Sequence, residues 1–425
     1  MTEALAVDQR IETCLDARAM QAVLQKTLPA CASGALSIDS ISISKVRRSS
    51  SRQRNPNPLT LCYELSLRDL ASGRTSTETY YGKVYRDGTA SDVANDIQVQ
   101  CVPSLDLLLW RWPADPGLPQ LPALLDLQQT CPWWGKAAEQ VVALRHVPED
   151  RATLRYSRRT SKGEEHLYAK TFCDGRASAV HERFRYFWTM SQLGAQFPVV
   201  AQPLAHDPET HTFWQSQAPG APLVQIVGGP GEAGLPDRVA HALSLMHAAP
   251  LALAGPLPRD RVHALIEVRR RQKKISRTVP ELELRVARLA DALEMASRQL
   301  PEPPIGLIHG DCHPEQFWVA HGQVVLFDFD EFALGDPMED LAAFVTKVSL
   351  LSGGPAFATA MLAAYSRHAP TRFDGRLLHW HLAVQQLLQA GRAFVFQVPD
   401  WRSQIESRLS RAESLADQLL LECSP

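Results

Sequence analysis

The chain has 425 residues, of which 45% are hydrophobic and 21% are charged, a balance typical of a folded protein with room for two or three domains. Its formal net charge of −2 gives no indication of a nucleic-acid or anionic-membrane partner. No apolar run approaches the roughly 18 residues that cross a bilayer, and charged residues interrupt the N-terminus. The eight cysteines form no CxxC pair, so we expect a cytoplasmic protein with reduced thiols.

The first predicted elements form an α+β region. Apolar residues at helical spacing predict a helix over residues 11–28, and alternating residues predict a strand over 36–46. A basic stretch between residues 45 and 54 follows, which we interpret as a solvated connection because the whole chain is not basic. A hairpin then pairs residues 59–68 with 77–86.

A weak internal repeat joins two strands that each carry Tyr-x-Lys and end in Asp-Gly. Lys83 lies in the first copy and Lys170 in the second. A helix predicted over residues 177–192 follows the second copy and carries Glu182. After Lys83, residues 106–113 indicate only a short amphipathic segment. The two lysines therefore stand in different contexts.

The second half of the chain is predicted to be mainly helical. Helices are expected over residues 237–247 and 259–299. The basic run at residues 269–274 fits a solvated helix face. Further helices are predicted at 341–351, 357–365, 377–396 and 401–421.

Residues 307–344 carry the motifs that point to chemistry. A short apolar strand delivers His309-Gly310-Asp311 into a loop, and a second apolar run ends in Asp328-Phe329-Asp330. Two carboxylates at the ends of two strands suit a metal-assisted transfer, in which one meets the acceptor's proton and the other holds Mg²⁺.

The polar neighbours of these carboxylates suggest structural roles. His309 is expected to brace the loop backbone, whereas His313 fits either a structural or a ligand role. Asp336 and Asp340 are expected to cap and hold the loop rather than act in chemistry. Turn residues occur in every protein, but here the elements follow one another within about 35 residues, which favours a site.

This pattern resembles the aminoglycoside phosphotransferase and choline kinase family, whose signature is His-Gly-Asp-x-x-x-x-Asn followed by a strand ending in Asp-Phe or Asp-Trp. The resemblance covers residues 136–425 and implies an α+β, two-lobed protein-kinase-like fold with a small antiparallel-sheet lobe and a helical lobe. It implies domains at 136–220 and 221–425, with 1–135 as an added α+β domain, similar to the cap of maltokinase-like members, or an extension of the small lobe.

The resemblance also implies roles for the motif residues in a kinase that uses ATP or GTP with Mg²⁺. Asp311 would be the catalytic base, and Gln316 and Asp328 would bind the metal. Gln316 departs from the family's usual Asn by one methylene, and maltokinase-like members look similar in this respect. A longer stem puts the position of the metal in doubt.

The nucleotide would be bound by residues upstream of this motif. Lys170, held by Glu182, would contact the phosphates as a kinase strand lysine does, the alternative being an ordinary exposed strand lysine. Lys83 would be structural. Gln215 and Gln217, before a Pro-Gly-x-Pro-Leu turn, would lie at the nucleotide-binding hinge. No glycine-rich phosphate loop is present, which excludes a P-loop NTPase.

The acceptor is the least determined part. Residues 360–425 contain six acids and seven arginines, a balance that favours a neutral sugar or polyol over a polycationic aminoglycoside. Trp380 and Trp401 could stack on a sugar ring, although aromatics that pack helices are commoner. The sequence leaves the oligomeric state open.

Two other classes of function remain at this stage. His309, Asp311, His313 and Asp328 could bind a transition metal in a phosphoester hydrolase. The departure at Gln316 also leaves room for a nucleotide-binding pseudokinase that acts as a scaffold. Stabilisation of the fold by a nucleotide would distinguish the kinase and the pseudokinase from the hydrolase.

Overall fold

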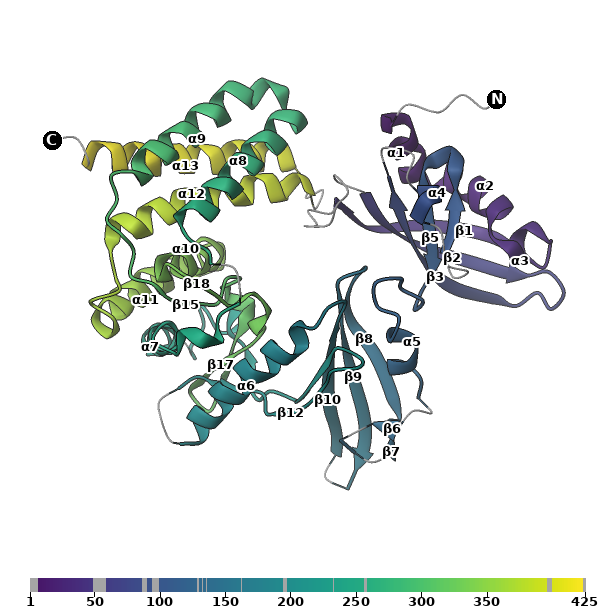
Figure 1. The fold of residues 1–425 in the computed structure, drawn as a ribbon, viewed down its shortest axis with the longest axis horizontal. Coiled ribbons are helices and arrows are strands. Elements are labelled where there is room, and N and C mark those ends of the chain that lie inside the picture. Colours follow the sequence, from purple (N-terminus) through teal and green to yellow (C-terminus); the bar gives the residue numbers. More distant parts are fainter. Residues whose placement is uncertain are drawn as a thin grey trace. The chain divides into compact units, whose positions relative to one another are not determined.

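A computed structural model gives the fold shown in Figure 1. The chain forms two compact units, Met1–Glu165 with Ala169–Asp174 and His166–Tyr168 with Gly175–Pro425. The first contains mainly strands and the second mainly helices, which confirms the predicted α+β class. The three predicted domains stay a prediction. The structure describes residues 7–48, 59–85, 90–93, 99–127, 130–131, 133–134, 136–161, 163–193, 197–231, 233–255, 258–395 and 400–422.

An antiparallel sheet of order β1-β2-β3-β5-β4 opens the first unit. Its side chains alternate between two faces. One face, including Leu61 and Tyr63, forms a core with Met20 and Leu24 from the helices that cover it (Figure 1). The elements are α1 (Val7–Leu15), α2 (Ala17–Thr27), α3 (Pro29–Ala32), β1 (Leu36–Arg48), β2 (Leu59–Asp69), β3 (Thr75–Val84), α4 (Ala90–Val93), β4 (Val99–Val102) and β5 (Leu107–Arg111).

Two predictions for this region need correction. The single helix expected over 11–28 is two helices, because the Asp16 carboxylate accepts a hydrogen bond from the Ala19 amide at 2.8 Å and starts α2. Residues 107–111 form a strand, not an amphipathic segment, and residues 107–110 are buried. Their continuous apolar run is the pattern of a strand covered on both faces. The 59–68 hairpin is confirmed.

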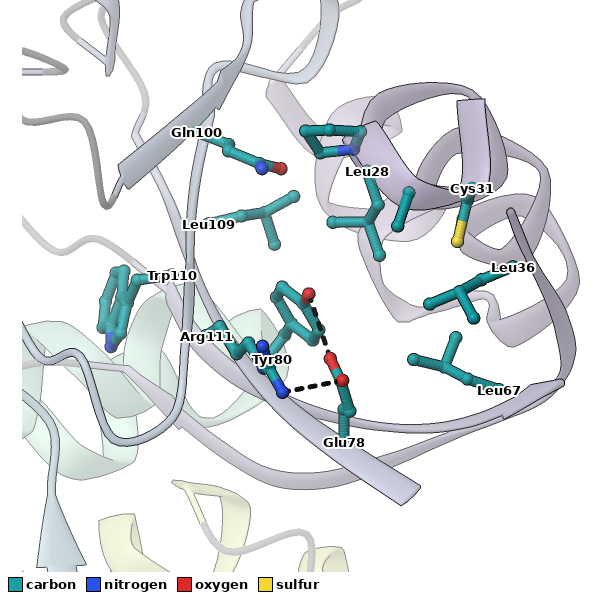
Figure 2. A pocket seen from close by; sticks show the side chains of 12 residues that line it. Leu28, Cys31, Leu36, Leu67, Glu78, Tyr80, Gln100, Leu109, Trp110 and Arg111 are labelled. Atoms are coloured by element: carbon teal, nitrogen blue, oxygen red, sulfur yellow. Dashed lines mark hydrogen bonds and ion pairs between the residues drawn. The ribbon is translucent and has the colours of Figure 1, made fainter. Parts of the chain in front are cut away.

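A cavity of about 320 Å³ lies between α3 and the sheet, and Figure 2 shows its lining. Leucine side chains form part of its walls, with polar groups from Glu78, Gln100 and Arg111. The Glu78 carboxylate at its rim accepts a hydrogen bond from the Tyr80 hydroxyl at 3.3 Å and pairs with Arg111 at 2.8 Å. These contacts compensate the charge of Glu78 within the domain.

A second set of strands completes the first unit. β8 pairs antiparallel with β9, and β10 follows β9 in the same sheet. Tyr156 of β9 donates its hydroxyl proton to the Leu124 carbonyl at 2.5 Å, which ties the sheet to a short preceding helix. The elements are α5 (Leu121–Leu124), β6 (Thr130–Cys131), β7 (Lys136–Ala137), β8 (Gln140–Val147), β9 (Arg151–Thr160) and β10 (Gly163–Phe172).

The second unit combines short hairpins with a large helical part. β12 pairs antiparallel with β13, and β16 with β17. The helices α8, α9, α12 and α13 pack on one another (Figure 1). The elements are α6 (Arg176–Gln192), β11 (Val199–Val200), β12 (Pro203–Asp207), β13 (Thr212–Ser216), β14 (Ala221–Pro222), α7 (Leu235–His247), α8 (Arg261–Thr278), α9 (Glu283–Ser297), β15 (Gly306–Ile308), β16 (Phe317–Ala320), β17 (Gln323–Leu326), β18 (Ala333–Gly335), α10 (Pro337–Val348), α11 (Gly354–His368), α12 (Gly375–Val395) and α13 (Trp401–Glu422).

The helix predicted over 259–299 is in fact two helices. Pro280 lacks an amide hydrogen and its ring excludes a continuous helix, so α8 ends at Thr278 and α9 begins at Glu283. The other predicted helices of this unit are confirmed. No helix within the described ranges is long and apolar enough to span a bilayer.

Candidate active site

The loop after β15 is held in place by one buried carboxylate. Asp340 of α10 accepts hydrogen bonds from the amides of His309 at 2.6 Å and Gly310 at 3.0 Å. Gly310 has φ +78°, and a Cβ there would lie 2.3 Å from the Glu331 carbonyl oxygen. The sequence therefore needs glycine at this position for the loop to turn toward Asp311.

Asp340 is itself part of a buried polar network. His247 Nε2 lies 3.1 Å from its carboxylate, and His247 Nδ1 lies 2.7 Å from the Tyr365 hydroxyl. Asp340 is 1% exposed and the other two are fully buried. A fully satisfied buried network of this kind gives the loop one conformation, so the predicted holding role of Asp340 is confirmed.

The other predicted bracing residues also have structural partners. His309 Nε2 lies 2.8 Å from the Phe327 carbonyl oxygen, which joins the loop to the end of β17. Asp336 accepts a hydrogen bond from the Met338 amide at 2.9 Å, caps α10 and contacts His381 at 3.0 Å. Both expectations, a brace and a cap, are confirmed.

Four polar side chains follow one another across the site. His313 Nε2 lies 3.7 Å from Asp311 Oδ2 and 3.3 Å from Gln316 Nε2. Gln316 Nε2 lies in turn 3.4 Å from Asp328 Oδ2. The structure thus brings the three residues predicted for catalysis and metal binding into one continuous row, with His313 between them.

Asp311 is ionised at neutral pH. Its side chain is 43% exposed. Partial burial acts to raise its pKa, but the nearby His313, with Lys347 and His309, holds the pKa well below the usual value. A carboxylate of low pKa accepts a hydrogen bond readily but is a weak proton acceptor.

Gln316 and Asp328 provide a donor set that fits Mg²⁺. Carboxylate and amide oxygens are the ligands that this hard cation prefers. Rotating the Gln316 amide by half a turn exchanges its nitrogen and oxygen, an assignment that hydrogen bonding alone decides, and turns the oxygen toward Asp328. Across the part of the chain that the structure describes, no three or more His, Cys, Asp or Glu side chains form a metal-binding group.

Sequence reasoning missed Arg183, which holds the loop that follows Asp328. This α6 residue is 4% exposed. Its guanidinium donates to the backbone carbonyls of Phe329 at 2.5 Å, Asp330 at 3.1 Å and Leu253 at 2.8 Å. A guanidinium can satisfy several fixed carbonyls at once, so Arg183 determines where the Asp328 loop lies. Its burial has no signature in the sequence.

We expect Arg183→Met to weaken the proposed Mg²⁺ site about tenfold and to destabilise the fold by about 2–3 kcal/mol, because buried carbonyls lose their donors. The measurement is the Mg²⁺ concentration at half-maximal activity, with urea unfolding for stability. Arg367→Met is the matched control, because Arg367 forms an ion pair with Asp237 in which both side chains are at least half exposed. Equal Mg²⁺ dependence in both variants would contradict the assigned role.

Arg259 is a second arginine that the sequence did not identify. It donates to the Gly310 carbonyl and pairs with Glu331 at 3.1 Å and Glu339 at 3.4 Å. It therefore joins the loop before Asp311 to the segment after Asp328. Sequence reasoning placed Arg259 in a charged helix, but it precedes α8 and is partly buried.

The predicted nucleotide residues lie in both units. Lys170 lies in β10, with Nζ 5.8 Å from the Phe172 ring centroid. Glu182 of α6 pairs with Arg185 at 2.6 Å. Since Lys170 and Glu182 belong to different units, their pairing stays a prediction.

The predicted hinge glutamines flank the end of β13. Gln215 lies opposite Pro203 of β12. Gln217 follows the strand and lines a cavity of about 330 Å³ with Trp188 and Phe197. Their contact with a nucleotide stays a prediction.

Trp380 and Trp401 are the tryptophans that the sequence suggests for stacking on a sugar ring. Trp380 is 1% exposed, and its indole donates to the Leu293 carbonyl at 2.9 Å. A side chain packed in this way fills the helical core and offers no face to a ligand. Trp401 lies at the start of α13, and the Cζ atom of Arg402 lies 4.9 Å from the centroid of its ring.

The fold is that of the kinase-like phosphotransferases. The sequence profile described as "Phosphotransferase enzyme family" matches residues 143–378, which include Lys170, Asp311, Gln316 and Asp328. The chain belongs to this family, and the predicted kinship and two-lobed fold class are confirmed.

The individual proteins that resemble this chain either match only a short part of it or share little sequence identity with it. The amicoumacin kinase of Bacillus subtilis (strain 168) is 33% identical over 79 residues, or 18% of this chain and 24% of the relative. The match thus spans about a quarter of that relative's length. A choline/ethanolamine kinase family protein of Mesorhizobium loti has a TM-score of 0.46 at 17% identity, covering 70% of this chain and 92% of the other. A thermostable mutant of aminoglycoside phosphotransferase APH(4)-Ia has a TM-score of 0.48 at 16% identity, covering 66% and 95%.

Proposed function

We propose that this chain is a kinase that transfers the γ-phosphoryl group of ATP to a hydroxyl of a small molecule. The observation that carries the proposal is the continuous row of Asp311, His313, Gln316 and Asp328. Family membership supports the same reaction class. GTP is the alternative donor.

Each residue of the row would have a distinct part in the transfer. Gln316 and Asp328 would hold Mg²⁺, which supplies positive charge to the phosphate oxygens when bound. Asp311 would accept a hydrogen bond from the acceptor hydroxyl and direct its oxygen in line with the γ-phosphorus. Because the pKa of Asp311 is depressed, orientation would come first and proton uptake late, as the loose transition state of phosphoryl transfer allows.

Residues outside the row would bind the nucleotide. Lys170 would contact the phosphates, and Glu182 would orient its ammonium group, as a strand lysine and a helix glutamate do in kinases. Gln215 and Gln217 would contact the base at the hinge.

We propose a neutral acceptor, a sugar or other polyol, rather than a polycation. Lys347 lies on α10 seven positions after Asp340 and therefore on the same face of the helix. Its charge and that of Asp311 influence each other's pKa, and Arg392 also acts on Lys347. A polycationic acceptor beside Asp311 would meet the charge of Lys347.

The test is thermal stability with Mg·ATP or Mg·GTP, followed by an acceptor screen by phosphate transfer. Ligand at about 100 times its dissociation constant should stabilise the native chain by about 2.7 kcal/mol. The Asp328→Ala variant should lose this gain, because it removes the main metal ligand. Asp330→Ala is a nearby control.

The outcomes separate the other classes of function. Stabilisation by Zn²⁺ or Mn²⁺ without nucleotide would favour a hydrolase, although His309 already contacts the Phe327 carbonyl. Stabilisation by nucleotide without transfer to any acceptor, sugars and cationic aminoglycosides included, would favour a pseudokinase.

A further inference from the structure

The turn between β8 and β9 contacts the sheet formed by β1 to β5, the N-terminal sheet. Lys83 of β3 places its Nζ 2.7 Å from Glu149 Oε2 at the tip of the turn. The two side chains are 11% and 25% exposed, so solvent screens this pair less than it screens a surface pair. Burial acts to lower the pKa of Lys83, but Glu149 raises it above the usual value. The lysine is therefore charged.

A buried carboxylate fixes the backbone of the same turn. The side chain of Asp115 has no exposed surface. It accepts hydrogen bonds from the amides of Glu149 at 3.0 Å and Gly117 at 2.8 Å, and lies 2.7 Å from His146 Nε2. A Cβ on Gly117 would lie 2.4 Å from the Glu149 Cα. The segment that follows β5 is thus in close contact with the turn.

Aromatic packing adds to these polar contacts. The His146 ring, at the end of β8, lies 4.7 Å from the Tyr81 ring centroid and 4.6 Å from that of Trp112. Tyr81 lies two positions before Lys83 on β3, so both side chains extend from the same face of the strand. One face of the N-terminal sheet therefore contacts both the start and the tip of the turn.

The composition of the turn gives these contacts a functional meaning. No glycine lies in residues 147–151, and the tip carries Glu149 and Asp150. In kinases a loop that lies one strand ahead of the lysine strand covers the nucleotide phosphates, and an uncompensated carboxylate there would repel them. The β8–β9 turn has this position relative to β10, which carries Lys170. Here Lys83 neutralises Glu149, and Arg151 lies 3.1 Å from Asp150.

We propose that the N-terminal sheet positions the β8–β9 turn over the nucleotide phosphates, and that Lys83 is a positioning residue that neutralises Glu149 there. This inference rests on the proposed function. It gives the N-terminal sheet a role in nucleotide binding in addition to the roles of Asp311, Gln316 and Asp328. The lysine acts through Glu149 and not by contact with the phosphates, which Lys170 would make.

The experiment compares Lys83→Met, Glu149→Gln and the double variant. We expect Lys83→Met to raise the KM for Mg·ATP about tenfold with little change in kcat, because it leaves a carboxylate unpaired beside the phosphates. Adding Glu149→Gln should restore most of the affinity, since the repelling charge is then absent. Arg68→Met is the matched control, because it breaks an ion pair with Asp39 that is 2.8 Å long but more exposed.

Hydrogen exchange of residues 147–151 reports on the contact itself, with and without Mg·ATP. Lys83→Met should accelerate exchange there, and nucleotide should protect the turn in the native chain. Unchanged exchange in Lys83→Met would overturn the positioning role. Faster exchange with an unchanged KM, or a KM that Glu149→Gln fails to restore, would overturn the link to the nucleotide. A native chain that binds no nucleotide would instead refute the proposed function, while exchange without nucleotide still reports on the contact.

Discussion

Asp311→Asn should lower kcat by about 10²–10⁴, the usual contribution of a positioned acid or base. The amide keeps the size of the carboxylate but not its charge, so it orients the acceptor hydroxyl poorly and takes up no proton. Binding of Mg·ATP should change little, because the metal ligands are Gln316 and Asp328. The measurement is steady-state turnover with the acceptor found by screening, with nucleotide affinity from thermal stability.

Glu315→Gln is the matched control for this substitution. Glu315 is also close to His313, at 3.5 Å, but its side chain is 76% exposed. It should therefore keep turnover within a few-fold of the native value. Native turnover in Asp311→Asn would show that another group orients the acceptor.

Asp340→Ala should destabilise the fold by about 3–5 kcal/mol, the cost of breaking a buried charged network by removing one partner. The substitution leaves the amides of His309 and Gly310 without their acceptor and His247 without its carboxylate. Turnover should also fall, because the loop that presents Asp311 loses its fixed position. Urea unfolding gives the stability, and activity is measured well below the unfolding transition.

Asp237→Ala provides the comparison on the surface. Asp237 pairs with Arg367 and His368, and its side chain is 51% exposed. Exposed pairs contribute about 1 kcal/mol or less, so this variant should unfold close to the native midpoint. A similar loss of unfolding free energy in both variants would contradict a large contribution of the Asp340 network to stability.

The stability that Asp340 provides should depend on pH. Burial acts to raise the pKa of Asp340, but hydrogen bonding and charge from His247, with contributions from His309, lower it below its usual value. A carboxylate with a depressed folded-state pKa contributes fully above its unfolded pKa of about 4, and the contribution disappears as pH falls below that value. The loss of stability between pH 5 and 3 should therefore be smaller in Asp340→Ala than in the native chain.

The sequence alone determined the parts of this protein that depend on local order. Asp311, Gln316 and Asp328 lie within 18 positions. Gln316 directly precedes β16 and Asp328 follows β17, and the local hairpin of these two strands brings both residues close together. The bracing roles of His309 and Asp340 followed from the same short stretch. The 59–68 hairpin was also evident, because strand alternation and turn residues are local signals.

Only the tertiary structure decided which distant residues support the site. Arg183 donates to the Phe329 carbonyl, which lies 146 residues further along the chain. Arg259 donates to the Gly310 carbonyl, 51 residues away, and Lys83 pairs with Glu149, 66 residues away. No periodicity marks such residues, since a buried arginine and a solvated one look alike in sequence. Their partners are backbone carbonyls and single carboxylates, whose positions exist only after the helices and sheets have packed.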